Sequence, residues 1–498
     1  MKKTLKTTLV SALALFTLVG CGFTSAGSTK STDAASETAA AVSTDAASLV
    51  SKRDASGEYD AAEAVKLSAK DDLTITEAGV YILSGSYDGM IVIDALEEDK
   101  VQLVLDNAAL TNDDGPVIYV KNADKVFITA AEGTKNSISD GTGYSFTDGE
   151  TSVDAAVYSK ADLTINGAGS LSISGNSKHS VVSKDDLVIT AKDLTVNAVN
   201  VGLNGKDSVI FSEASVTITA GSDGVRSDND TDAEKGAVTV LNSALTITAG
   251  NDGIQAETAF TAEDAKLTIQ SGGGSSASAA SSEESYKAIK AGGAITINGG
   301  SYDMDSLDDA IHTNGTLFIT DGDFTLQSRD DAIHADEKAE ISGGTLTITA
   351  AEGIEATYVL ISGGDITIQA SDDGINAASK STAYTPTVEI SGGTVTVTMG
   401  AGDTDGIDSN GDILISGGTV SVNGNSAFDY DGSASFTGGT VYVNGQQVTS
   451  LPNQMMGGGM GGFGQGGFPG GDMGGQGGFG GGHGAMGGFG GHGARPGF

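Results

Sequence analysis

From about residue 71 onward, apolar and polar residues alternate in short runs. Residues 73–75 (LTI), 346–348 (LTI) and 395–397 (VTV) are three of these runs. A period of two with many β-branched residues is typical of half-buried β-strands. Gly-Gly, Asn-Gly and Asp-Gly pairs separate the runs and indicate turns. No stretch of the sequence has a long helical period, so the pattern predicts an all-β protein built from many short strands.

One apolar position can be followed through the repeating region. It is occupied by Val157, Val181, Leu203, Val225, Ile254, Ile289, Ile311, Ile333, Ile354, Ile375 and Ile407. Most steps between neighbours are 21 or 22 residues, and the longest steps contain apparent insertions near residues 228–236, 272–284 and 379–386. A fixed period of this length is the signature of a repeat protein in which each unit stacks on the next.

Each unit carries three short strands. In the unit that begins at Ile333, the strands are expected at residues 333–335, 339–342 and 346–349, with a Gly343-Gly344 turn between the last two. Three strands in about 22 residues form one coil of a parallel β-helix, whereas a propeller blade needs ~40 residues. We therefore predict a single-stranded parallel β-helix over residues 59–450.

The two ends of the chain have different compositions. Residues 1–20 combine a basic start with a short apolar run, which indicates a secretory signal. The following Cys21 lies in a bacterial lipobox-like context, so we expect it to be lipidated and to anchor the protein on the extracellular face of the cell membrane. Residues 21–58 are predicted to be a flexible tether, and the Gly/Met/Phe-rich residues 451–498 a disordered tail.

Charge and cysteine content narrow the function. The 498 residues carry 65 acidic and 26 basic side chains, for a formal net charge of −39. This excess of acid argues against nucleic-acid binding, which needs Lys and Arg for phosphate contacts. The single Cys excludes an internal disulfide and a multi-Cys metal site. We expect a monomer.

Acidic residues recur at the corner just before the tracked apolar position. Equivalent carboxylates in neighbouring coils would lie ~4.8 Å apart and repel one another. Ca²⁺, which takes 6–8 oxygen ligands, can offset that repulsion by bridging them. The predicted calcium ligands form a first cluster of Asp303, Asp305, Asp308, Asp309, Asp330 and Asp331, and a second cluster of Asp372, Asp373, Asp403, Asp405 and Asp408. Solvated turn aspartates are the simpler alternative, because Asp is common at turns.

Polar residues just after the tracked position are candidates for ligand contact. His312 and His334 are 22 residues apart and should therefore stack on one outer face. They can be surface ladder residues, ligand contacts or metal ligands. Asn314, Asn376 and Tyr302 complete the predicted ligand-binding set.

The rung motif resembles a known family. The Asp-Asp-Gly-Ile-x-Ala corner at residues 372–377 and the Ile-Ser-Gly-Gly-Thr-Leu-Thr-Ile turn at residues 341–348 are similar to those of bacterial carbohydrate-binding domain-containing β-helix lipoproteins of cellulolytic and gut clostridia. The resemblance covers about residues 70–440. It implies a right-handed coil similar in fold to calcium-dependent pectate lyases, calcium in the acidic corners, and binding of cellulose and polygalacturonate.

Three functions remain open from the sequence. The first is a surface-anchored, calcium-dependent binder of plant cell-wall polysaccharide, acidic or cellulosic. The second is a polysaccharide lyase acting by β-elimination, which needs a metal and a base of lowered pKa. Its candidate catalytic residues are Lys290, Lys287 and Arg329. Lys287 falls where other coils place Asp, and both lysines can instead offset the acidic column electrostatically. The third is a rigid scaffold or adhesin.

Overall fold

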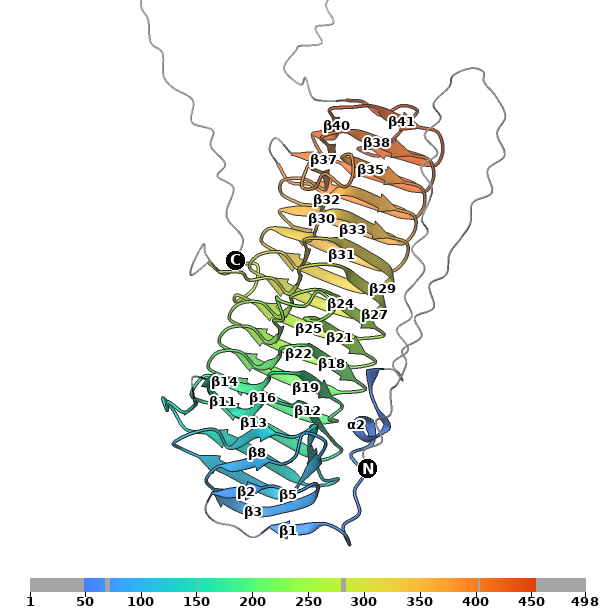
Figure 1. The fold of residues 1–498 in the computed structure, drawn as a ribbon. Coiled ribbons are helices and arrows are strands. Elements are labelled where there is room, and N and C mark those ends of the chain that lie inside the picture. The colour runs from blue at the N-terminus through green and yellow to red at the C-terminus, as the bar shows by residue number, and fades with distance from the viewer. Residues whose placement is uncertain (1–48, 68–71, 150, 279–283, 402–403, 454–498) are drawn as a thin grey trace, which may run out of the picture.

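The computed structural model describes residues 49–67, 72–149, 151–278, 284–401 and 404–453. Within these ranges the protein is all-β with one short helix, and nearly all strand pairs are parallel. Figure 1 shows the strands stacked one above another from the blue N-terminal end to the red C-terminal end. This architecture is compatible with the predicted parallel β-solenoid.

The strands form three rows, and each strand pairs with its equivalent in the neighbouring coils. The first row contains β2 (Leu73–Ile75), β4 (Ile91–Asp94), β6 (Ile118–Asn122), β11 (Ala155–Ser159), β14 (His179–Ser183), β17 (Leu203–Gly205), β20 (Val225–Ser227), β23 (Ile254–Ala256), β26 (Ile289–Ala291), β28 (Ile311–Thr313), β34 (Ile375–Ala377), β37 (Asp405–Ser409) and β40 (Ser426–Tyr430). The second row contains β1 (Val65–Leu67), β7 (Lys125–Ala130), β12 (Asp162–Gly167), β15 (Asp186–Ile189), β18 (Ser208–Ser212), β21 (Ala237–Leu241), β24 (Phe260–Glu263), β35 (Thr387–Ile390), β38 (Asp412–Ile415) and β41 (Ala434–Phe436). The third row contains β8 (Lys135–Asp140), β13 (Ser170–Gly175), β16 (Asp193–Ala198), β19 (Ser215–Ala220), β22 (Ala244–Ala249), β25 (Lys266–Ser271), β31 (Thr345–Ala350), β33 (Asp365–Ala370), β36 (Thr394–Met399), β39 (Thr419–Asn423) and β42 (Thr440–Val443).

Six longer strands turn a corner and join two rows. The second and third rows are joined by β3 (Gly79–Asp88), β5 (Lys100–Asn112), β27 (Ile295–Ser306) and β29 (Thr316–Ser328), and the first and second by β30 (Asp331–Ile341) and β32 (Glu352–Ile361). The described residues also contain a small antiparallel pair, β9 (Thr147–Asp148) with β10 (Thr151–Ser152). Strand β43 (Gln446–Val448) pairs antiparallel with β42 and covers the edge of the last coil, which blunts a ready template for aggregation.

The tracked apolar position is confirmed as a single register. Val157 pairs with Val181, Ile289 with Ile311, and the series continues to Ile375 with Ile407. All eleven members have no exposed surface. The insertions fall between strands, so they lengthen a turn and leave the stacked side chains in place.

The repeated Ser-Gly-Gly turn has a conformational cause. Its second glycine has a positive φ of +88° at Gly344 and +87° at Gly364. A side chain is strained in this left-handed region, whereas glycine adopts it freely. Glycine is therefore favoured at this position of the turn between the second and third rows, and the Ser-Gly-Gly motif recurs where the turn recurs.

The predicted N-terminal tether ends in residues that contact the coils. Its last described residues form α2 (Lys52–Ser56), which begins with a capping box at Ser51 and lies beside the lower coils (Figure 1). Asp54 is buried, with its carboxylate 2.8 Å from Lys125 Nζ and 2.5 Å from Thr164 Oγ1. These contacts attach residues 51–58 to the coils, while Cys21 and residues 454–498 lie outside the described residues. The described part contains no helix that could span a membrane.

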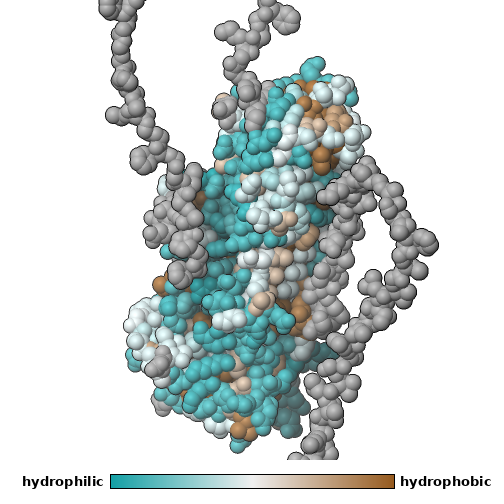
Figure 2. All heavy atoms as spheres, turned by 45° about the horizontal axis from the view of Figure 1, so that its top comes forward, coloured by the Kyte–Doolittle hydropathy of each residue, from teal (hydrophilic) through white to brown (hydrophobic). Residues whose placement is uncertain are grey.

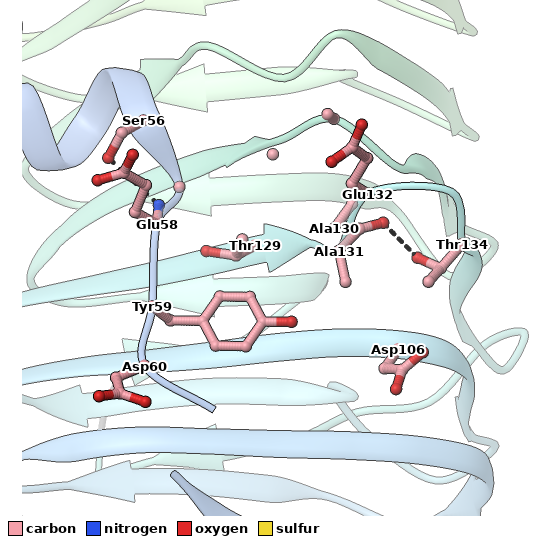
Figure 3. A pocket seen from close by; sticks show the side chains of 13 residues that line it. Ser56, Glu58, Tyr59, Asp60, Asp106, Thr129, Ala130, Ala131, Glu132 and Thr134 are labelled. Atoms are coloured by element: carbon pink, nitrogen blue, oxygen red, sulfur yellow. Dashed lines mark hydrogen bonds between the residues drawn. The ribbon is translucent and has the colours of Figure 1, made fainter. Parts of the chain in front are cut away.

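A hollow of about 960 Å³ lies beside this segment. Tyr59 on the segment and Asp106, Thr129 and Glu132 on the coils are among its lining residues (Figure 3). Hydrophilic residues cover much of the molecular face that Figure 2 shows.

Candidate functional site

Two columns of polar side chains run along the corner that precedes the first row of strands. We define the corner column as the residues two positions before the tracked apolar residue: Asp223, Asp252, Lys287, Asp309, Asp331, Glu352, Asp373 and Asp405. The outward column follows that residue and consists of Arg226, Gln255, Lys290, His312, His334, Glu355, Asn376, Asp408 and Asp429. Lys287 thus occupies a position where neighbouring coils carry a carboxylate, as the sequence predicts.

The corner carboxylates tie consecutive coils together. In four of the seven, one oxygen accepts a hydrogen bond from the backbone N–H of the next corner residue: Asp223 from Asp252 (3.3 Å), Asp252 from Lys287 (2.8 Å), Asp309 from Asp331 (3.1 Å) and Asp373 from Asp405 (3.2 Å). The recurrence of Asp at this corner therefore has a structural reason that is independent of any metal ion.

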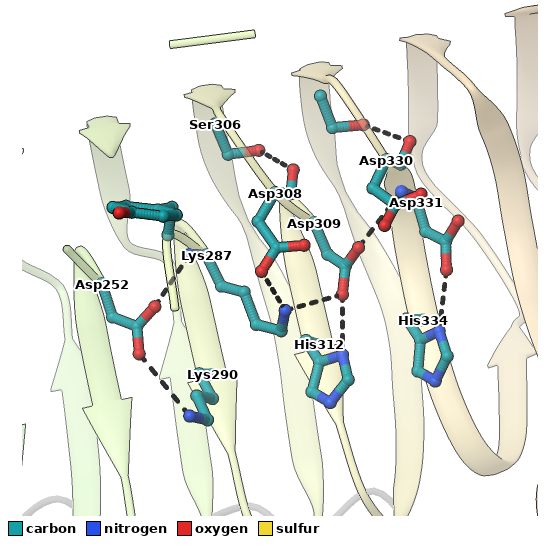
Figure 4. A network of polar contacts seen from close by, with 12 residues as sticks. Asp252, Lys287, Lys290, Ser306, Asp308, Asp309, His312, Asp330, Asp331 and His334 are labelled. Carbon is teal, nitrogen blue, oxygen red and sulfur yellow. Dashed lines mark hydrogen bonds and ion pairs between the residues drawn. The ribbon is translucent and has the colours of Figure 1, made fainter. Parts of the chain in front are cut away.

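In the N-terminal half of the columns, basic side chains offset the carboxylates. Lys287 Nζ lies 2.5 Å from Asp308 Oδ2 and 3.2 Å from Asp309 Oδ2. Lys290 Nζ lies 3.8 Å from Asp252 Oδ2. The first predicted calcium cluster thus contains an ammonium group among its carboxylates (Figure 4), which competes with a metal ion for the same oxygens.

The two histidines stack as the sequence predicts. Their ring centroids are 4.6 Å apart, with an angle of 14° between the planes. His312 Nδ1 lies 2.8 Å from Asp309 Oδ2. His334 Nδ1 lies 2.7 Å from Asp331 Oδ2 and 2.9 Å from Glu355 Oε2. Figure 4 shows both rings pointing the same way from adjacent coils.

These contacts perturb the ionisation of the cluster. Burial lowers the pKa of His334, but its hydrogen bonds to Asp331, Asp336 and Glu355 outweigh burial and raise that pKa to about 12. Burial raises the pKa of Asp309, but the hydrogen bond from His312 and the charge of Lys287 bring it well below its ordinary value. The hydrogen bonds from His334 lower the pKa of Asp336 and help to lower that of Glu355, whereas burial and the charges of neighbouring carboxylates raise the pKa of Asp331 to about 8.

The C-terminal half of the columns has a different electrostatic balance. The pKa of Asp373 is raised to about 7, first by burial and then by the charges of Glu352, Asp372 and Asp405. Burial and the charges of Asp373, Asp429 and Asp405 raise the pKa of Asp408 to about 7. The carboxyl groups of this half are partly buried and close to one another, so ionising all of them costs free energy.

Two buried oxygens in the coils on either side of Asp408 have no hydrogen-bond partner among the residues that the structure describes. They are Asn376 Oδ1 and Asp429 Oδ1. The Asn376 amide nitrogen donates to Glu352 at 3.0 Å. That hydrogen bond fixes the orientation of the amide and leaves its oxygen free for another partner.

Several predicted site residues lie elsewhere. Tyr302 is 1% exposed and stacks on Phe324 with centroids 4.5 Å apart, so its prediction as a ligand contact is wrong. Asp303 and Asp305 lie on β27 and do not join a potential metal-binding group in the described part of the chain, whereas Asp308, Asp309 and Asp330 do.

Among the remaining predicted residues, Asn314 contacts a histidine of the outward column, whereas Asp372 and Arg329 are exposed. Asp372 is exposed beside Asp373, and Asp403 lies outside the described residues. Asn314 Oδ1 lies 3.2 Å from His312 Nε2, where it can accept a hydrogen bond from the ring N–H. Arg329 is exposed and donates to the Ala277 carbonyl at 3.4 Å.

The lyase alternative gains no support from Lys287. Burial lowers the pKa of Lys287, but the charges of Asp309 and Asp308 outweigh this effect and raise it. A general base for β-elimination at neutral pH needs a lowered pKa. Lys287 instead acts as a counter-ion.

The predicted site set omits three contributors to the columns. The repeat period places Glu352 in the corner series and Glu355 in the outward series, and the structure confirms both registers. Lys380 approaches Glu355 to 2.9 Å from the insertion at residues 379–386. A separate group formed by Asp162, Asp185 and Asp186 lies at the start of second-row strands.

The stacked parallel strands thus carry two polar columns along the corner that precedes the first row. A family model for carbohydrate-binding domain-containing proteins matches residues 69–332 and 317–449, which is more than half of the chain. The chain therefore belongs to this family.

Two known proteins resemble parts of the chain. A carbohydrate-binding domain-containing protein of Acetivibrio thermocellus is 35% identical over 129 residues, which are 26% of this chain and 45% of that protein. The match thus spans less than half of the relative's length. A solved structure described as a polysaccharide lyase-like protein from C. thermocellum, in a gadolinium derivative, has 32% identity and a TM-score of 0.42 over 46% of this chain and 89% of its own.

Proposed function

We propose that this protein binds plant cell-wall polysaccharide along the corner and outward columns, and that Ca²⁺ is required for acidic glycans such as polygalacturonate. Family membership supports carbohydrate binding. The observation that carries the choice of surface is the continuous polar column within the matched region. Its successive side chains repeat at the strand spacing, and a polymer can therefore contact several coils at once.

The proposed calcium position is the C-terminal half of the columns. Asp373, Asp405, Asp408 and the oxygens of Asn376 and Asp429 are hard oxygen donors, which Ca²⁺ prefers. Burial first, and then repulsion from neighbouring carboxylates, raise the pKa values of Asp373 and Asp408 there. A divalent cation would offset this repulsion and also attract the carboxylates of a polyuronate, which the net charge of −39 would otherwise repel.

An aromatic pair formed by β32 and the insertion at residues 379–386 is suited to contact sugar rings. Tyr384 is 40% exposed, and its ring centroid is 5.6 Å from that of Tyr358. Tyr384 belongs to the same insertion as Lys380, which reaches Glu355 in the outward column. An exposed tyrosine offers an apolar face for a pyranose and a hydroxyl for hydrogen bonding.

We also propose where the protein is located and how it is anchored. A lipid on Cys21 would hold a monomer on the extracellular face of the membrane, with the coils forming a right-handed parallel β-helix. The sequence of residues 1–21 and the family resemblance support this setting.

Retention on insoluble pectate and cellulose tests the function. The wild type and an Asp373→Asn/Asp408→Asn variant are incubated with each glycan in Ca²⁺ and in chelator. We expect wild-type retention on pectate to need Ca²⁺, and the variant to bind at least tenfold more weakly. The matched control is Asp323→Asn/Asp365→Asn, which removes the same charge from exposed third-row positions.

Each other outcome changes the account. Equal retention in chelator would show that binding does not require Ca²⁺. Failure to bind any glycan would favour the scaffold alternative. A rise in ultraviolet absorbance from unsaturated product would identify a lyase.

A further inference from the structure

We propose that Asp331, His334 and Glu355 form a site for a borderline divalent transition metal ion such as Zn²⁺, distinct from the proposed calcium position. All three side chains are buried, and their donor atoms lie within 4.8 Å of one another. The inference does not depend on carbohydrate binding.

The donor atoms lie slightly closer together than in an occupied tetrahedral zinc site, so they would separate by a few tenths of an ångström around an ion. His334 Nδ1 lies 2.7 Å from Asp331 Oδ2 and 2.9 Å from Glu355 Oε2. Bonds of about 2.0–2.1 Å place two ligands at right angles about 2.9 Å apart, and two tetrahedral ligands about 3.3 Å apart. One ring nitrogen facing two carboxylates can donate a single proton, whereas a metal ion can bind all three groups.

A carboxylate at the second ring nitrogen of His334 also orients the ring. Its Nε2 lies 3.2 Å from Asp336 Oδ1, on the side opposite the proposed ligands. Metal-binding histidines characteristically donate their second ring N–H to a carboxylate, which fixes the tautomer and strengthens the ligand. An imidazole ligand favours Zn²⁺ and similar ions over Ca²⁺.

The local charge leaves room for a divalent cation. Lys287 pairs with Asp309, and Lys380 Nζ lies 2.9 Å from Glu355 Oε2, the oxygen that faces His334, so an ion would have to displace Lys380. Asp331 and Asp336 form no ion pair with a lysine or arginine among the described residues. The Lys380 side chain is 37% exposed and can swing away from Glu355, whereas the Lys287 side chain is only 12% exposed. The Asp331–His334–Glu355 group is therefore more accessible to an ion than the Asp309–His312–His334 group.

Calorimetric titration of chelator-treated protein with Zn²⁺ tests the proposal. Because His483 and His492 in the tail can also bind metal, every protein carries His483→Ala and His492→Ala. We expect one site that persists in excess Ca²⁺ and weakens at least 100-fold with His334→Gln. Asp336→Asn should weaken it 10- to 100-fold. His312→Gln, the equivalent change one coil away, should change affinity less than threefold.

Two further measurements keep the result decisive. Co²⁺ bound to the same protein should give visible d–d bands that Glu355→Gln alters, and circular dichroism reports whether each variant is folded. If His334→Gln does not fold, loss of the bands in folded Glu355→Gln supports the site. Absence of Zn²⁺ binding at micromolar concentration, displacement by Ca²⁺, or equal loss with His312→Gln would overturn the proposal.

Discussion

At the scale of single residues, Lys287 is a cation within a column of carboxylates. Its side chain is 12% exposed and forms ion pairs with Asp308 and Asp309. The repeat register predicts its place in the column, because the period aligns it with Asp309. The ion pairs themselves depend on side-chain directions that the period does not determine.

Replacing Lys287 should destabilise the coils. Lys287→Met leaves Asp309 buried beside Asp308 without its ammonium partner, and loss of one partner of a buried pair costs about 3 kcal/mol. We expect a lower urea midpoint, with most of the loss recovered in Lys287→Met/Asp308→Asn/Asp309→Asn. An unchanged midpoint in the single variant would show that the ion pairs contribute little.

The corner aspartates should also make stability depend on pH. Burial and the charge of Asp252 raise the pKa of Asp223 to about 6, despite the opposing charge of Arg226, from an ordinary value of 3.8. The folded state therefore binds the proton more tightly. Its stability relative to the unfolded chain falls as pH rises from about 4 to 6, and the penalty is complete above that range.

Asp223→Asn removes this penalty while retaining an oxygen that can accept the Asp252 N–H. We expect the variant to gain stability over wild type between pH 4 and 7, by about 2–3 kcal/mol at pH 7. Urea unfolding at several pH values measures the difference. A difference that is constant with pH would contradict the assigned cause.

The residue type of Tyr302 did not show whether its side chain lies on the surface or in the core. Tyr302 lies inside because it occupies an inward position of β27, in register with Phe324. Asp303 and Asp305 alternate with it and point away from the core. The same alternation could have separated these three residues from the corner cluster.

At the scale of elements, the sequence predicts the strand register because one slip would move every apolar side chain to the wrong face. It does not predict that β29 and β30 continue around corners, because strand continuity there depends on backbone bending. It also misses α2, whose five residues are too few for a helical period. The capping-box residues Ser51 and Asp54 are the local signal.

Asp54 should hold α2 against the coils. Burial raises its pKa, but hydrogen bonds from Lys125, Ser51 and Thr164 outweigh this and lower it below 3.8. Its stabilisation is thus present above about pH 4 and is lost as pH falls through the lowered pKa. Asp54→Ala should raise amide hydrogen exchange in residues 51–58 and leave the column strands protected. Unchanged exchange would show that other contacts hold the segment.

At the scale of the whole molecule, the polar columns divide into two halves. Basic side chains offset the N-terminal half, whereas carboxylates dominate the C-terminal half. The sequence predicts the existence of the columns but favours Asp308 and Asp309 as the main calcium cluster. The ammonium group of Lys287 reverses that preference, and the proposed ion position moves toward Asp373 and Asp408.

The most direct test of the proposed function is isothermal titration of the wild type with an oligogalacturonate, first in Ca²⁺ and then in chelator. The account predicts saturable binding in Ca²⁺ and at least a tenfold loss of affinity in chelator, equivalent to about 1.4 kcal/mol. Equal affinity in both buffers would contradict calcium bridging by the C-terminal half of the columns.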